Sequence, residues 1–326
     1  MEKCNRSART CLLLIFLCMG LTAQNTEGTS PASPRSTLHA THILGFEGIA
    51  NNATGEISIQ EHALRFQKGA ASSGQTSIGQ ISVSSIENLF LGEEDKQVGG
   101  TTMAVGRAAA PYGGGRVIAL FSHKKYDTLT LEYLDPDGRF HGAIFQLDKG
   151  EGSVLKNELA AEGTHVADAK DPAITEVTTE VRNVGAWSVE VERVDPGDVN
   201  IEPAFRVAIY ENLLDELAKT KQFKHVFRSG DRNAGGPDLL ILKTRVQKYT
   251  PGSETRRAVT TVSGATKLNV RSQLCTPDGQ VVLERMVDGN VRFFGGNLRA
   301  THNLAHNVAD SFKKSTLPAR PLSSRE

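Results

Sequence analysis

Apolar and polar residues alternate with a period of two in several short stretches between residues 39 and 165. The clearest two stretches are Thr128–Leu134 and Phe140–Leu147, and the sequence Asp-Pro-Asp-Gly at Asp135–Gly138 separates them. The alternation predicts strands with one buried face, and the turn sequence predicts an antiparallel hairpin. Apolar residues of Glu151–Ala161 follow helical spacing instead. We therefore expect antiparallel strands followed by one amphipathic helix.

A second patterned region covers residues 186–314. A helix is predicted from Pro203 to Leu217, because proline suits a helix start and apolar residues recur there every four positions. Thr266–Cys275 and Gln280–Val287 alternate around a second Pro-Asp-Gly turn and predict another hairpin. A final helix is predicted around Leu304–Phe312. This order predicts a layer with helices on one face of a mostly antiparallel sheet.

The predicted fold class is therefore α+β, and the length of 326 residues is typical of two domains. Irregular segments rich in Ser, Thr, Pro or other small residues separate the patterned regions. The predicted organisation is a signal peptide over 1–23, a flexible tether over 24–38, a β domain over 39–165, a linker over 166–185, an α+β domain over 186–314 and a disordered tail over 315–326.

The amino-terminal residues have the pattern of a secretory signal peptide. Three basic residues precede the apolar run 11–21, and small residues follow up to Ala23. The run is shorter than the roughly 20 residues that a membrane-spanning helix needs. We expect cleavage near Ala23 and a periplasmic or extracellular location, either free or membrane-associated. An uncleaved membrane anchor is the alternative; lipidation of Cys18 is disfavoured because large apolar residues precede it.

Composition narrows the range of partners. The chain has 37 basic and 37 acidic residues, so its net charge offers no long-range attraction for nucleic acid, and no nucleic-acid partner is expected. With 39% hydrophobic and 23% charged residues, the chain is neither largely disordered nor a multi-span membrane protein. Cleavage leaves Cys275 as the only cysteine, so no intrachain disulfide is expected.

Two resemblances add to these patterns. The strand run, hairpin and closing helix of residues 39–165 resemble a pleckstrin-homology or GRAM domain, which implies an antiparallel β-barrel closed by one helix. The second resemblance rests on Leu213–Leu217, Phe223–Val226, Asp238–Leu242, the Pro277–Gly279 turn and the helix after Gly296. Through them, residues from about Trp187 to Leu317 resemble an uncharacterised family of bacterial envelope domains, similar in plan to periplasmic subdomains of the curli-secretion pore subunit and to the TolB amino-terminal domain. This resemblance implies an interaction module without known catalytic residues.

The alternation also predicts one binding surface. If strands 238–249 and 266–275 pair, four basic residues share the face opposite the apolar positions. They are Lys243, Arg245, Lys267 and Arg271. Such a patch suits an anionic polymer or a lipid headgroup. The alternative is cross-strand ion pairing, because the alternation along the next strand places Glu284 and Asp288 on the same outward face.

Other candidate residues predict no catalytic centre, metal site or cofactor. His302 and His306 have the i, i+4 spacing at which two imidazoles can bind one metal, but no third ligand accompanies them and their neighbours place them at the surface. His141 and His123 lie at strand ends without a nucleophile motif. The glycine-rich segment 98–116 lacks a phosphate-loop pattern and is expected to be a structureless insertion, with a backbone anion cradle as the alternative.

We therefore predict an exported, non-enzymatic binding or interaction module of the bacterial cell envelope that needs no cofactor. The predicted partners are an envelope protein, an anionic polymer or a membrane surface. The alternative is a hydrolase whose site uses His141 or the glycine-rich segment. A hydrolase brings a nucleophile and titratable groups together in a closed pocket, whereas a binding module presents an exposed patch.

Overall fold

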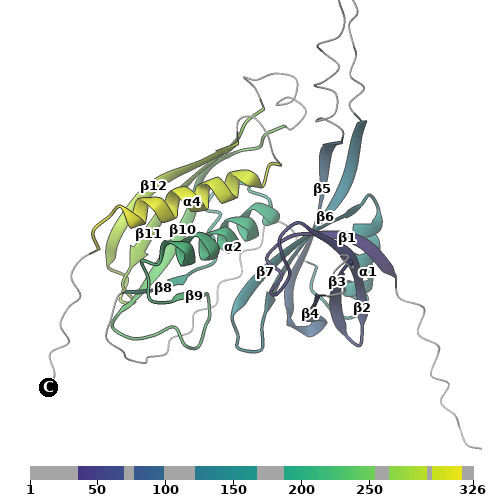
Figure 1. Ribbon diagram of the computed structural model, residues 1–326, viewed down its shortest axis with the longest axis horizontal. Helices are drawn as coiled ribbons and strands as arrows, with labels where there is room; N and C mark the ends of the chain where they lie inside the picture. The colour runs from purple at the N-terminus through teal and green to yellow at the C-terminus, as the bar shows by residue number, and fades with distance from the viewer. Residues whose placement is uncertain are drawn as a thin grey trace, which may run out of the picture. The chain divides into compact units, whose positions relative to one another are not determined.

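The computed structural model describes residues 36–69, 77–98, 122–166, 187–253, 264–291 and 296–317. Residues from Arg35 onward form one compact unit, in which the strands belong to two sheets (Figure 1). Helices and strands are both present, so the fold class is α+β, as the alternation predicts. The predicted signal peptide, and nearly all of the predicted tether, linker and tail, lie outside the described residues.

The first sheet has seven strands in the order β4-β3-β2-β1-β7-β6-β5, and every neighbouring pair is antiparallel. Its strands are β1 (Thr37–Leu44), β2 (Ala53–Gln60), β3 (Ala63–Lys68), β4 (Ile78–Ser82), β5 (Ile86–Val98), β6 (Ser122–Leu134) and β7 (Phe140–Asp148). Within the described ranges, the end strands β4 and β5 do not pair with each other. The closed barrel implied by the pleckstrin-homology resemblance is therefore not confirmed.

The predicted Asp-Pro-Asp-Gly hairpin joins β6 to β7, with Leu134 paired to Phe140. Gly138 has a φ of +82°, a conformation that glycine adopts without steric cost. Asp135 caps the turn, because its Oδ1 accepts the backbone N–H groups of Asp137 and Arg139, each at 2.9 Å. Local turn chemistry thus explains why this hairpin is predictable from sequence.

Helix α1 (Glu151–Ala161) covers the core of the first sheet. Its buried residues Leu155 and Leu159 join a cluster that includes Ile57, Phe66 and Phe145 from three strands. All five side chains are essentially inaccessible to solvent. The described residues contain no disulfide. Burial of this apolar surface is therefore the main source of stability for this region.

The second sheet has five strands in the order β12-β11-β10-β8-β9. They are β8 (Ser188–Val191), β9 (Val226–Arg228), β10 (Leu239–Thr250), β11 (Thr266–Cys275) and β12 (Val281–Val291). β10, β11 and β12 are antiparallel, whereas β8 runs parallel to both β10 and β9. The sheet is thus mixed, because the helix that connects β8 to β9 acts as a crossover and returns the chain in the same direction.

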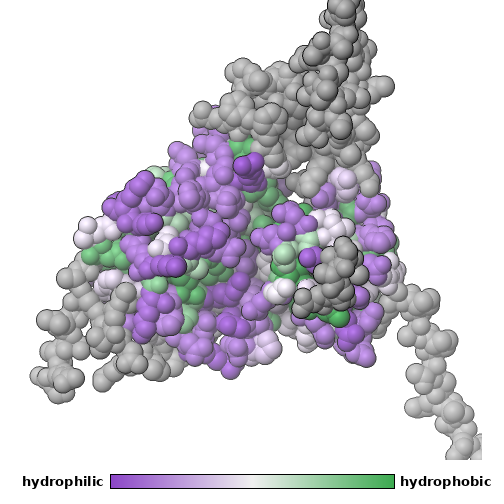
Figure 2. Space-filling view, in the orientation of Figure 1, coloured by the Kyte–Doolittle hydropathy of each residue, from purple (hydrophilic) through white to green (hydrophobic). Residues whose placement is uncertain are grey.

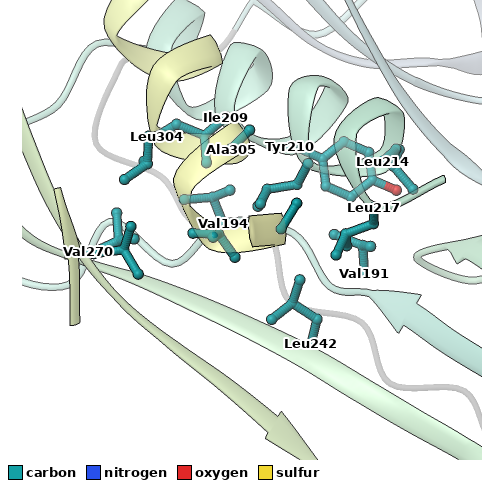
Figure 3. Packing of buried hydrophobic residues seen from close by; sticks show 14 of the residues in the cluster. Val191, Val194, Ile209, Tyr210, Leu214, Leu217, Leu242, Val270, Leu304 and Ala305 are labelled. Carbon is teal, nitrogen blue, oxygen red and sulfur yellow. The ribbon is translucent and has the colours of Figure 1, made fainter. Parts of the chain in front are cut away.

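Helices α2 (Pro203–Thr220) and α4 (Arg299–Lys313) cover one face of this sheet. Figure 3 shows Ile209 of α2 and Leu304 of α4 lying above Leu242 and Val270 of the strands. Gly289 lies in β12 where the strand faces α4. A Cβ atom on Gly289 would lie 2.4 Å from the Leu304 Cβ and 2.5 Å from the Ala300 carbonyl oxygen, so glycine allows α4 to pack closely against the strand.

A small apolar cluster links the two sheets. Leu44 and Ile144 of the first sheet pack with Val207 and Ala208 of α2. Phe140, the first residue of β7, belongs to the core beneath α2. The two predicted domains therefore contact each other through β7 and α2. Their boundary stays a prediction, since residues 167–186 lie outside the described part of the chain.

Candidate functional site

The outward face of the second sheet carries cations on the adjacent strands β10 and β11. β10 and β11 pair, and the register places Arg245 directly opposite Arg271 and Lys243 opposite Gln273. Neither strand contains an acidic residue. We call the exposed cations of these strands the basic seam: Lys243, Arg245, Lys248, Lys267 and Arg271. The seam contains all four residues that the alternation places on this face, and a bulge between Val246 and Lys248 adds the fifth.

Acidic residues border the basic seam on both sides. Glu192, Asp195 and Asp198 follow β8 in the chain, and Glu284 and Asp288 lie on β12. Glu192 Oε1 lies 3.7 Å from Lys243 Nζ. Asp195 Oδ2 lies 3.5 Å from Arg245 Nε. The face therefore has a cationic centre between two acidic margins.

The tightest of these ion pairs joins Arg271 and Glu284, with 2.7 Å between Nη2 and Oε2. Their hydrogen bond raises the pKa of Arg271 and lowers the pKa of Glu284. Both side chains are exposed, so solvent screening leaves the pair little net stability. Ion pairing, the alternative that the sequence left open, applies to three of the four predicted residues. In the described part of the face, Lys267 has no carboxylate within ion-pair distance.

A second cluster of titratable residues lies at the β6–β7 turn. One potential ligand atom from each of Glu47, Asp135 and His141 lies within 4.8 Å of the others. Asp135 Oδ2 already accepts a hydrogen bond from Arg139 Nε at 2.5 Å, and His141 Nε2 lies 3.1 Å from the same oxygen. The nearby guanidinium opposes binding of a cation. This cluster is better explained as the cap of a turn than as a metal site.

His141 is nearly inaccessible to solvent, and its ring stacks on Tyr133 with 5.1 Å between the centroids. Burial lowers the pKa of His141, and the positive charge of Arg228 lowers it further. Its hydrogen-bond partner among the described residues is the Asp135 carboxylate, not a Ser, Thr or Cys nucleophile. The geometry therefore gives the hydrolase alternative no support at His141. The side chain of His123 and residues 99–121, with nearly all of the glycine-rich segment, lie outside what the structure describes.

Near His141, a largely buried ion pair connects the two sheets. Arg228 of β9 binds Glu211 of α2 through two hydrogen bonds, of 2.8 Å and 2.9 Å. The backbone N–H of Gly142 in β7 donates to Glu211 at 3.0 Å, and Arg228 donates to the Phe140 carbonyl at 3.2 Å. Burial raises the pKa of Glu211, although the hydrogen bonds and charge of Arg228 oppose this. We call Glu211 and Arg228 the buried clamp, because they hold β7, α2 and β9 together.

Three further sequence candidates have defined places. Cys275 is a buried free thiol whose pKa is raised by burial, so it is not an activated nucleophile. His302 and His306 are exposed on α4, and both lie beside Glu216 of α2. Neither the role of Glu216 nor the buried clamp was predictable from the sequence, because the partners are distant in the chain and only the packing of helices and strands brings them together.

The described surface in the view of Figure 2 is mostly hydrophilic, with hydrophobic residues in smaller, separate areas. Among the described residues, every helix is too short or too polar to span a lipid bilayer.

Comparison with known proteins assigns no family. No family model matches the chain, and no curated protein matches it. Solved structures that are similar to part of it include two PelC dodecamers. The PelC dodecamer from Paraburkholderia phytofirmans has 13% identity and a TM-score of 0.29, covering 40% of this chain and 92% of that chain. A point variant of that PelC dodecamer has 12% identity and a TM-score of 0.28, covering 41% and 92%. Likeness at this level carries no argument about function.

Proposed function

We propose that this chain is an exported, non-enzymatic binding module of the bacterial cell envelope that holds an extended anionic polymer along the basic seam. The observation that supports this proposal is the separation of charge on the outward sheet face. The charged residues of β10 and β11 are all cations, and the carboxylates lie at the margins. The envelope location rests on the predicted signal peptide and on the resemblance of residues 187–317 to envelope domains.

The spacing of the seam suits a repeating anion. Neighbouring strands lie about 4.8 Å apart, and outward side chains recur about every 6.8 Å along a strand. A polymer lying along β10 and β11 would meet cations from both strands. The guanidinium groups of Arg245 and Arg271 can bind carboxylates in a bidentate manner. Because the present ion pairs are exposed and weak, a polyanion can replace the marginal carboxylates at low cost.

The charge pattern makes the other two predicted partners, a membrane surface and an envelope protein, less favourable than an anionic polymer. A flat anionic membrane would meet the acidic margins as well as the seam, which costs electrostatic energy. A protein partner would need a matching acidic ridge of similar width. An extended polyanion needs neither condition, and we therefore favour it.

We also retain the pleckstrin-homology-like plan for the first sheet as a proposal. Seven antiparallel strands followed by α1 support it. In a closed form of this plan, further contacts would join the β4 and β5 ends of the sheet.

Charge reversal tests the proposed function. Arg271→Glu is expected to weaken binding of fluorescent alginate oligomers, a polyuronate probe, about tenfold or more, because it places a negative charge inside the seam. Binding to the unaltered chain is expected to weaken as NaCl rises, since the Debye length falls to about 8 Å at 0.15 M. Fluorescence anisotropy measures both effects.

Lys314→Glu is the matched control. Lys314 forms an exposed ion pair with Asp310 at 2.6 Å near the end of α4, so this variant also loses one exposed ion pair and changes the net charge by the same amount. We expect it to bind alginate almost as the unaltered chain does. Equal losses in the two variants would show a net-charge effect and reject the seam. Absence of binding to alginate and to a sulfated polymer alike would reject the polyanion.

A further inference from the structure

The two exposed histidines of α4 face a carboxylate from the neighbouring helix. His302 and His306 are one turn apart and therefore lie on the same face of α4. Glu216 of α2 reaches both rings: its Oε2 lies 3.0 Å from His306 Nδ1, and its Oε1 lies 3.9 Å from His302 Nδ1. Each ring thus directs the same nitrogen toward the same side chain.

Glu216 is held as an ionised acceptor. Its side chain is only 9% exposed, and Lys219 Nζ donates a hydrogen bond to its Oε1 at 2.7 Å. An ionised carboxylate only accepts hydrogen bonds, so it favours the histidine tautomer that carries its proton on Nδ1.

This tautomer leaves the metal-binding lone pair on Nε2 of His306, whose Nδ1 is hydrogen-bonded to Glu216, and Nδ1 of His302 faces the same carboxylate at ion-pair distance. The side chains of His302 and His306 are 52% and 66% exposed. No hydrogen bond from a described residue engages Nε2 of either histidine. Histidines that bind metals in proteins commonly donate the other ring N–H to a carboxylate, which fixes the tautomer and the ring orientation.

We propose that His302 and His306 bind one Zn²⁺ ion through their Nε2 atoms, with Glu216 as the residue that orients both rings. Imidazole nitrogen is a preferred zinc ligand, and water completes the coordination of a site that has few protein ligands. The spacing of the two histidines in the sequence identifies the two ligands, whereas Glu216 can be identified as the orienting group only from the fold. The site lies on α4, which covers the inner face of the second sheet, so it is independent of the basic seam on the outer face.

Equilibrium dialysis of the full chain against Zn²⁺ tests this site. We expect one ion per chain, and we expect His302→Ala and His306→Ala each to weaken binding at least about tenfold by removing a ligand. Glu216→Gln is expected to weaken binding about 10- to 100-fold, although both ligands remain, because it removes the charged acceptor that orients them. Imidazole ¹⁵N chemical shifts are expected to show Zn²⁺ at Nε2 of both residues.

His62→Asn is the matched control. His62 is also an exposed histidine beside a carboxylate, since its Nδ1 lies 2.5 Å from Glu162 Oε2, but no histidine lies four residues before or after it. This variant is expected to bind Zn²⁺ as the unaltered chain does. Circular dichroism spectra establish that each variant is folded. The proposal is overturned if the unaltered chain binds no Zn²⁺, or if the two α4 variants keep its affinity while folded. Neither outcome bears on alginate binding.

Discussion

Arg228→Met is expected to destabilise the folded chain by about 3–5 kcal/mol, the cost typical of removing one partner of a buried ion pair. The variant leaves Glu211, which is nearly inaccessible to solvent, with only the backbone N–H of Gly142 as a described hydrogen-bond donor. It also removes the hydrogen bond from Arg228 to the Phe140 carbonyl. Urea denaturation followed by circular dichroism measures the loss.

The destabilisation of Arg228→Met is expected to depend on pH. Burial raises the pKa of Glu211, and loss of Arg228 removes the charge that opposes this shift. A carboxyl whose pKa is higher in the folded than in the unfolded state binds more protons when folded. The folded variant therefore gains stability as pH falls through the folded pKa, and loses it as pH rises. The deficit relative to the unaltered chain should be smaller at pH 5 than at pH 8.

Glu211→Gln combined with Arg228→Met is the control for the buried clamp. The double variant removes both charges and keeps a side chain of similar size, so it is expected to recover more than half of the stability that Arg228→Met loses. If the double variant is as unstable as the single one at every pH, loss of packing and not an unpaired charge explains the defect.

Gly45→Ala is expected to destabilise the chain by about 3 kcal/mol or more, from backbone strain and overpacking together. Gly45 has a φ of +88°, which disfavours any residue with a Cβ atom. A Cβ at this position would lie only 1.8 Å from the Gly142 carbonyl oxygen in β7, so the backbone itself would have to move. Thermal unfolding measures the change.

Gly48→Ala separates the two causes. Gly48 has a similar φ of +76°, but a Cβ there would meet no atom within 4 Å. It should therefore show the backbone cost alone, about 1–2 kcal/mol. Equal destabilisation of the two variants would contradict the close approach of the Gly45 loop to β7.

Structural features that depend on residues close together in the sequence were predictable from the sequence. The hairpin at Asp135–Gly138 follows from proline and glycine at fixed turn positions, and the structure confirms it. The alternation of apolar and polar residues along β10 and β11 is sufficient to place Lys243 and Arg271 on the exposed face of the sheet without knowledge of the fold. The α+β class follows from the same two periodicities.

Features that depend on which elements become neighbours were not predictable. The parallel pairing of β8 with β10 joins strands that α2 and β9 separate in the chain, and it brings Asp195 beside Arg245. Glu216 meets His306 across 90 residues because α2 packs on α4. Hydrophobic periodicity identifies the buried face of a helix but not the helix against which that face packs.

The placement of a polyanion along the basic seam can be measured directly by lysine acetylation of the full chain with and without alginate, followed by mass spectrometry. The proposal predicts that bound alginate slows acetylation of Lys243 and Lys267 on the outer sheet face and leaves Lys313 and Lys314 at the end of α4 unchanged. Equal protection of all four lysines, or protection of the α4 pair alone, would contradict it.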